Sequence, residues 1–397
     1  MKRKIVIAAS WLLAAASQAQ TLGAALEQAW SRHPQAPAFS AREAEVQARA
    51  DLAAGLTPSP PSLSLSNVSD RLNANAGKDA WELELAVPLW LPGQRAARGQ
   101  EAGRAADDVA ARRSALRLQL AGELREAWWA LDSARQALAL ATQRAAAARA
   151  LEVDVVRRFK TGELARVDAN LAQNERLAAE AEALEAESAW RLAEQTYRAL
   201  TGVDAPARLT AETPAARPEA GVDHPQLAAA QTLAQLAQAR LKVAEQTRRD
   251  APELALRLVR ERGDFSAPYA QSVGIKLTVP FSSGARVRQD ASAAQAESLQ
   301  AEGELALAQQ RLTLEAERAR WALDVAQQQL DKAQERQRVT ADSLRLAEKA
   351  FALGESGLST LLRARLALRE ADVFFNRQHS ARLAGVSRLN QSLGVMP

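Results

Sequence analysis

The stretch FKTGE at Phe159–Glu163 returns in altered form as FALGE at Phe351–Glu355, about 192 residues later. The same offset takes Trp129 onto Trp321. Other pairs of landmarks follow the same register, so the chain contains an internal duplication. Each half is therefore predicted to be one copy of the same structural unit.

Composition and charge narrow the class of protein. Ala, Leu, Glu, Arg and Gln dominate, aromatic residues make up only 4 %, and charged residues of both signs make up 25 %, as is typical of long helices and coiled coils. The formal net charge is +4, without a basic tail, so nucleic acid is not an expected partner. Three His, no Cys and no clustered catalytic constellation argue against an enzyme, and no cofactor or metal site is expected.

Residues 1–19 have the pattern of a secretory signal. A basic start at Lys2–Lys4 is followed by an apolar core, Ile5–Ala16, and by small residues ending at Ala19. No later apolar run is long enough for a transmembrane helix. The chain is therefore expected to be exported, and any membrane contact would have to use strands.

Two pairs of segments alternate between apolar and polar residues with a period of two. They predict strands at about 61–69 and 80–88, and again at about 253–261 and 271–280. Such strands fit a membrane β-barrel, with one face toward lipid and one toward the lumen. They also fit a half-buried hairpin in a soluble domain. Four strands cannot close, so a barrel would need other copies of the chain.

Each strand pair is followed by a long stretch without proline, at 93–159 and at 284–351. About 66 residues of helix measure on the order of 100 Å, far more than an ordinary globular helix. Gly162 and Gly354 then predict turns from which a second helix returns. The predicted domains are a first repeat at 20–203, a linker at 204–223 and a second repeat at 224–397.

Each repeat also opens with a His-Pro pair, at His33-Pro34 and His224-Pro225. A metal ligand and a helix break with a solvated or capping histidine are both possible interpretations. Neither histidine has a second ligand at i+4, which favours the helix break.

This order of elements, with its two Phe-x-x-Gly-Glu turns and its proline-to-glycine strand exits, resembles the TolC family of outer-membrane efflux ducts over about Thr21 to Val395. The resemblance implies a homotrimer in the cell outer membrane that extends into the periplasm. Three chains would contribute four strands each to a twelve-stranded β-barrel set in lipid, above an α-helical barrel. A periplasmic adaptor (membrane fusion) protein and an inner-membrane pump of the RND type would be partners. The short linker and C-terminus are more similar to the CzcC-type branch, which implies heavy metal resistance.

The resemblance also implies where a gate would lie. In the family, acidic residues after the glycine turns line a constriction, and Asp168 follows Gly162 by six residues. The corresponding positions of the second repeat, Thr360 and Arg363, are not acidic, so one ring of three carboxylates is expected rather than two. An alternative role for Asp168 is a solvated carboxylate in the first turn of a helix.

The adaptor is expected to grip the turns themselves, which places Gly162, Glu163, Gly354 and Glu355 at the contact. Solvation of a surface carboxylate is the alternative role for Glu163 and Glu355.

The sequence thus predicts a passive exit duct of a tripartite efflux system, mainly helical with a small transmembrane β part. The alternative is a soluble periplasmic coiled-coil adaptor or scaffold protein. An adaptor would be expected to have one helical hairpin and many more strands.

Overall fold

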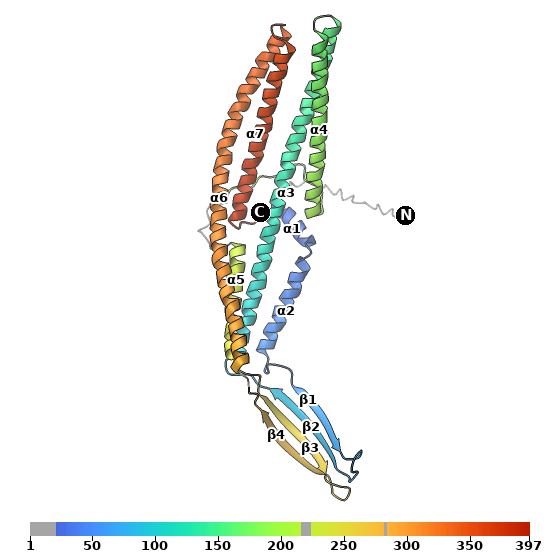
Figure 1. Ribbon diagram of the computed structural model, residues 1–397, viewed down its shortest axis with the longest axis vertical. Helices are drawn as coiled ribbons and strands as arrows, with labels where there is room; N and C mark the ends of the chain where they lie inside the picture. The colour runs from blue at the N-terminus through green and yellow to red at the C-terminus, as the bar shows by residue number, and fades with distance from the viewer. Residues whose placement is uncertain (1–20, 216–223, 282–283) are drawn as a thin grey trace, which may run out of the picture. The chain divides into compact units, whose positions relative to one another are not determined.

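The computed structural model describes residues 21–215, 224–281 and 284–397. The predicted signal segment and residues 216–223 of the predicted linker lie outside the described residues. The elements follow one another as α1 (Leu22–Arg32), α2 (Ala36–Ala54), β1 (Ser62–Ser69), β2 (Asp79–Pro88), α3 (Gln94–Lys160), α4 (Arg166–Thr201), α5 (Pro225–Gln246), β3 (Glu253–Arg262), β4 (Ala270–Thr278), α6 (Gly284–Ala352) and α7 (Leu358–Ser392) (Figure 1). Each strand and each long helix begins and ends within about two residues of its predicted bounds.

The described residues divide into two compact units. The first comprises residues 21–33, 119–215 and 316–397, and the second comprises 34–118, 224–281 and 284–315. Each unit contains segments from both halves of the sequence. The helices α3 and α6 each contribute residues to both units. The division into two repeats and a linker describes the sequence and stays a prediction.

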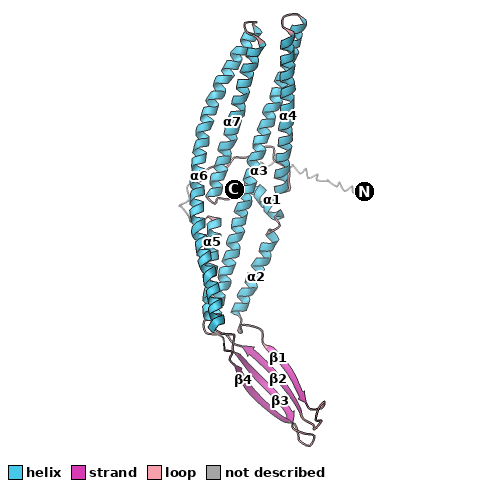
Figure 2. Cartoon of the chain, in the orientation of Figure 1, coloured by secondary structure: helices cyan, strands magenta, loops and turns pink. Residues whose placement is uncertain are grey.

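The second unit holds a single antiparallel sheet with the strand order β1-β2-β3-β4 (Figure 2). Leu63, Leu85, Leu256 and Ile275 face one another across the four strands. Because side chains alternate along each strand, this register collects the large apolar residues on one face.

The other face of the sheet carries charged side chains. Arg257 of β3 bonds to Glu82 at 2.5 Å and lies 3.3 Å from Glu84, and Lys276 of β4 lies 3.3 Å from Glu84. These four residues form a continuous cross-strand lattice of ion pairs. The sheet therefore has one apolar and one charged face.

The helices begin and end where capping residues allow. Thr21 accepts a hydrogen bond from the Ala24 backbone N–H at 3.3 Å and so caps α1. His33 ends that helix, with its ring stacked on Trp30 at a centroid distance of 5.8 Å. His224 caps α5 by accepting from the Gln226 backbone N–H at Nδ1, 3.2 Å away. The predicted helix break is thus confirmed at His33-Pro34, and at His224-Pro225 the histidine has the predicted capping role.

Residues 206–215 of the predicted linker are held by side chains of the first unit, most of them on α3. Arg125, only 3 % exposed, binds both carboxylate oxygens of Glu212, at 3.0 and 2.6 Å. The same guanidinium donates to the Gln391 side chain at 2.5 Å and to the Val395 carbonyl at 2.9 Å. Trp128 adds a bond from its indole N–H to the carbonyl of Thr210 at 3.3 Å. Arg125 thus ties the linker and the C-terminal end of the chain to one helix.

Two further side chains hold the same part of the linker. Arg135 donates to the carbonyls of Pro206 and Ala207, at 3.0 and 2.8 Å. Asn390 of α7 accepts from the backbone N–H of Ala215 at 2.9 Å and donates to the carbonyl of Thr213 at 3.0 Å. The linker is therefore fixed mainly through its backbone, which explains how a segment without apolar periodicity is held in place.

Candidate functional site

The two glycine turns have the same backbone geometry. Gly162 and Gly354 adopt positive φ angles of 81° and 76°. In the first turn Gly162 N–H bonds to the Phe159 carbonyl at 3.1 Å and Glu163 N–H to the Arg158 carbonyl at 2.9 Å. This is the Schellman pattern, which satisfies carbonyls at the end of a helix and requires a left-handed residue.

The second turn repeats these bonds, at 3.1 Å from Gly354 and 2.9 Å from Glu355. Both glutamates are exposed, so each turn presents a carboxylate at its surface. Glu163 also accepts a hydrogen bond from the Thr161 hydroxyl at 3.0 Å, which fixes one of its oxygens within the turn.

Asp168 lies in the first turn of α4 and is partly exposed. Its carboxylate accepts a hydrogen bond from the backbone N–H of Ala165 at 3.2 Å. A carboxylate at this position satisfies a backbone donor and interacts favourably with the helix dipole. Asp168 therefore stabilises the start of α4, whatever further role it has.

Thr360 in the first turn of α7 and Arg363 in its second turn are exposed and contact each other, with 3.4 Å between the guanidinium and the threonine hydroxyl. Arg363 also reaches the Ser359 carbonyl at 3.4 Å. Within the described chain, no ion pair or hydrogen bond joins Arg363 to Asp168. The structure thus groups the two second-repeat candidates with each other, and places Asp168 apart in its own cap.

A shared core lies beneath both turns, and the sequence did not identify it. Buried side chains from four helices meet there, and they are Leu151, Val155, Ala172, Phe351, Leu358 and Leu361. Phe351 is 6 % exposed, whereas Phe159 in the first turn is 38 % exposed. The guanidinium of Arg158 lies 5.2 Å from the centre of the Phe351 ring. The two turns are therefore parts of one packed structure.

Further along the first unit, an ionic network joins the helical pair α3–α4 to the helical pair α6–α7 through α7. Glu182 of α4 binds Arg144 of α3 and Arg369 of α7, the latter at 2.8 Å. Arg144 also binds Glu175 at 2.9 Å. Glu and Arg residues scattered along long helices usually face water, so the sequence alone does not pair them, and co-varying positions in an alignment would have been needed.

The sheet of the second unit exposes its apolar face. Its side chains are 42–79 % exposed, and they are Leu63, Leu65, Trp81, Leu83, Leu85, Leu254, Leu256, Leu258, Val273, Ile275 and Leu277. An exposed apolar surface that extends over four strands marks an interaction site, either with lipid or with another protein.

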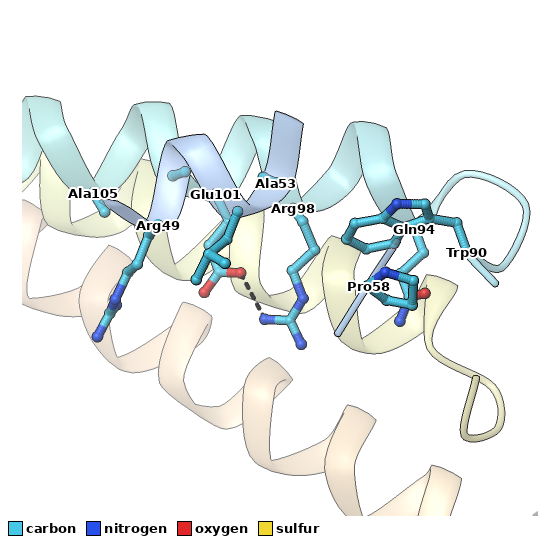
Figure 3. A pocket seen from close by; sticks show the side chains of 10 residues that line it. Arg49, Ala53, Pro58, Trp90, Gln94, Arg98, Glu101 and Ala105 are labelled. Carbon is cyan, nitrogen blue, oxygen red and sulfur yellow. Dashed lines mark hydrogen bonds and ion pairs between the residues drawn. The ribbon is translucent and has the colours of Figure 1, made fainter. Parts of the chain in front are cut away.

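A shallow pocket in the second unit lies between α2 and the start of α3, and Figure 3 shows it. Trp90 closes one end and donates its indole N–H to the Gly55 carbonyl at 3.2 Å. Arg98 pairs with Glu101 at 3.1 Å in the middle, and Arg49 lines the other end. No nucleophile paired with a base lines this pocket, so its residues suggest no chemistry beyond packing and ion pairing.

Within residues 21–215, 224–281 and 284–397, no three His, Asp or Glu side chains gather in a way that could hold a metal ion. In the same ranges, none of the helices is both long and apolar enough to cross a membrane.

Residues 217–395 match the family model described as outer membrane efflux protein. Residues 217–395 are thus similar to the outer membrane efflux protein family. The predicted resemblance to the TolC family is thereby confirmed. No curated protein sequence matches the chain.

Solved structures of outer-membrane proteins share the fold of the whole chain. The outer membrane protein VceC of Vibrio cholerae is 18 % identical with a TM-score of 0.75, and the match covers 94 % of this chain and 96 % of that one. The CmeC outer membrane channel of Campylobacter jejuni is 15 % identical with a TM-score of 0.74, covering 94 % and 85 %. The MtrE outer membrane channel of Neisseria gonorrhoeae is 16 % identical with a TM-score of 0.74, covering 95 % and 89 %.

These matches decide three of the predictions. The predicted fold class, mainly helical with a small antiparallel sheet, is confirmed by the fold that the chain shares with outer-membrane efflux channels. Efflux proteins of this family are channels rather than enzymes, which agrees with the prediction of a chain without catalysis. The family also confirms the predicted location at the outer membrane.

Proposed function

We propose that the chain is the exit duct of a tripartite efflux system, through which substrate passes passively from an inner-membrane pump and a periplasmic adaptor to the exterior. The observation that carries this proposal is the four-stranded sheet, with one exposed apolar face and one face of ion pairs. An apolar face toward lipid and a polar face toward a lumen is the pattern of a membrane barrel.

The number of strands supports a trimer. In hydrocarbon the outer edges of β1 and β4 would leave backbone groups unsatisfied, at several kcal/mol each. Strands from other copies remove that cost by pairing with these edges. Three chains with four strands each close a twelve-stranded barrel, as the family resemblance implies.

The long helices support a duct that extends into the periplasm. α3 has 67 residues and α6 has 69, and each measures about 100 Å along its axis. Helices from three copies would surround a continuous passage. The chain has no phosphate-binding glycine loop, so the pump, of the RND type, supplies the energy.

The glycine turns are the proposed docking point of the adaptor. Gly162 and Gly354 give the two repeats the same turn, and Glu163 and Glu355 are exposed beside them. A hairpin from the adaptor would therefore meet equivalent surfaces at two places in each chain. Metal cations are the proposed cargo, on the resemblance to the CzcC-type branch.

The gate is proposed to lie beside the turns, at Asp168. Three copies would form a ring of carboxylates, which favours cations where water screens poorly. Arg363, held against Thr360, would bring a positive charge near the same level and moderate that preference.

The test is to reconstitute the mature protein in planar lipid bilayers after measuring its mass in detergent by light scattering. A three-chain particle that conducts ions is the expected result. A soluble monomer or dimer that needs no detergent would contradict the proposal and favour the soluble scaffold.

A further inference from the structure

The apolar face of the sheet changes character at the end where its turns lie. β1 follows α2 and β4 leads into α6, so the β1–β2 and β3–β4 turns lie at the opposite end of the sheet (Figure 1). Beyond the last row of leucines, the next row across the strands includes Trp81 and Arg260, and the row after it includes Asp79 and Arg262. Because side chains alternate along a strand, both rows lie on the apolar face. That face therefore ends in an aromatic residue and two arginines.

An aromatic ring holds the two arginines side by side. The guanidinium of Arg260 lies 4.3 Å from the centre of the Tyr269 ring, and the guanidinium of Arg262 lies 4.9 Å from it. The Tyr269 hydroxyl donates to the Asp79 carboxylate at 2.9 Å, which fixes the position of the ring. Arg262 also donates its Nε–H to the Gly77 carbonyl at 3.1 Å. These contacts orient the two positive charges without neutralising both of them.

Neither arginine is bound to a carboxylate. Among the described residues, Arg260 forms no hydrogen bond, and neither Arg260 nor Arg262 forms an ion pair. The cations of the opposite face differ in this respect, since Arg257 and Lys276 are each bound to a glutamate of β2. The positive charge of the apolar face thus lacks the partners that the charged face provides for its own cations.

The carboxylates at this end of the sheet already accept other hydrogen bonds. Asp79 lies opposite Arg262 in the register, but its Oδ1 accepts from Asn67 at 2.8 Å and its Oδ2 accepts from Tyr269 at 2.9 Å. Asp264 in the β3–β4 turn accepts from the backbone N–H groups of residues 266 and 267, at 2.7 and 2.9 Å. One carboxylate for two guanidiniums leaves the two rows with a net positive charge.

The proposed duct places these charges at the outer surface of the membrane. Its sheet faces lipid with the apolar side, and its helices extend into the periplasm, so the turns point to the exterior. Trp81, which is 46 % exposed, then lies where barrels carry an aromatic girdle. Arginines beside such a girdle lie at the level of the lipid headgroups, and basic residues there attract anionic headgroups.

We propose that Arg260 and Arg262 bind a phosphate of the phosphorylated glycolipid that forms the outer leaflet, the lipid A part of lipopolysaccharide. The inference rests on the proposed duct and names the lipid that its sheet recognises. Residues two apart on a strand are about 6.6–6.8 Å apart, so both guanidiniums can reach one phosphate group. The planar fork of arginine matches phosphate oxygens, and the acyl chains would lie on the leucines of the same face.

An exposed aromatic residue extends this site into the turn. Phe265 is 63 % exposed, and the guanidinium of Arg262 lies 5.4 Å from the centre of its ring. The ring offers an apolar surface to the sugar that carries the phosphate. A glycolipid headgroup would therefore meet a cation and an aromatic surface together.

The test is to titrate the mature protein in a non-ionic detergent with lipid A and to count bound lipid by native mass spectrometry. An arginine near an anionic headgroup contributes about fivefold in affinity, so Arg260→Gln with Arg262→Gln should weaken binding about 30-fold. The matched control is Arg248→Gln with Arg249→Gln, which removes two exposed arginines before β3, at the other end of the sheet. Its affinity should stay within about twofold of that of the unmodified protein.

A second measurement uses the unmodified protein and so does not depend on how the variants fold. Lipid A should bind at least about tenfold more tightly than lipid A from which the phosphates have been removed. Equal binding of the two would overturn recognition of phosphate. Phosphatidylglycerol has a phosphate but no sugar, and binding as tight as that of lipid A would overturn the assignment to a glycolipid.

Light scattering and bilayer conductance separate failure of the site from failure of the duct. If a conducting three-chain particle forms, yet the Arg260→Gln, Arg262→Gln variant binds lipid A as tightly as the unmodified protein, the site is overturned and the duct stands. If the two substitutions abolish the three-chain particle, the arginines hold copies of the chain together and the lipid site is overturned. A chain that is soluble without detergent would overturn both.

Discussion

Replacement of Arg125 by methionine should release the linker from the first unit. The arginine is 3 % exposed, and Glu212, to which it is bound by two hydrogen bonds, is 11 % exposed at its side chain. Methionine keeps much of the aliphatic volume but leaves the Glu212 carboxylate, the Gln391 side chain and the Val395 carbonyl without their donor.

The cost follows from the loss of one partner from a buried ion pair, about 3–5 kcal/mol. Since 1.4 kcal/mol is a factor of ten, the equilibrium constant for local opening of the linker should rise on the order of 100- to 4000-fold. Trypsin reports this directly, because Arg208 lies exposed in the linker and cleavage tracks the open population when reclosing is fast.

Two further variants make the measurement specific. Arg191→Met removes an exposed ion pair with Glu187 in the same unit, and such pairs contribute little, so cleavage after Arg208 should change by less than threefold. Arg125→Met combined with Glu212→Gln should recover part of the loss, because no charge is left buried. If Arg125→Met is cleaved no faster than Arg191→Met, the linker is not held by this ion pair and the reasoning is wrong.

Three other changes have defined outcomes. Asp168→Asn should lower the cation preference of single-channel currents while the helix cap is largely kept, and unchanged ion selectivity would remove Asp168 from the gate. Gly162→Ala and Gly354→Ala should each destabilise the helical region by about 1–2 kcal/mol, measured as a lower Tm, because both positions have positive φ and an added Cβ meets no other atom. Burial lowers the pKa of His224 in the folded chain. Below a pH of about 6.5 this histidine is therefore protonated more readily in the unfolded chain than in the folded chain. Stability should therefore fall from pH 7.5 to 5.5, and His224→Asn, which keeps a capping acceptor, should flatten this dependence in thermal unfolding.

Much of the fold could be predicted from local patterns. Alternation of apolar residues gave the strands, the absence of proline gave the long helices, and the repeated glycines gave the turns. These patterns work because backbone geometry is decided by nearby residues: at Gly162, for example, the turn needs a positive φ that few other residues adopt.

The contacts between distant segments could not be predicted. From the sequence alone, Arg125 looks like any solvated arginine of a helix rich in charged residues. Its partner Glu212 lies 87 residues away, in a segment without periodicity. The segment Trp-Ala-Leu-Asp, which occurs at 129–132 and again at 321–324, illustrates the same limit. Trp129 is buried and Trp321 is exposed, although the two local sequences are identical. Burial depends on which helix covers the residue, and a local pattern carries no information about that.

The candidate gate stays a prediction. The resemblance led to Asp168, Thr360 and Arg363, and the structure puts all three at the start of returning helices. What it adds is the capping bond of Asp168 and the common core of the two turns, neither of which follows from residue spacing.

The common core beneath the turns has a mechanical consequence. Leu151 and Val155 come from one helical pair, and Phe351, Leu358 and Leu361 come from the other, yet they pack as one cluster. A force applied by a partner to either turn is therefore transmitted to both, because bending one pair alone would pull apart close-packed side chains. The two turns of each chain should therefore move together, so that a partner bound at only one turn, as in the proposed docking of an adaptor, would move both.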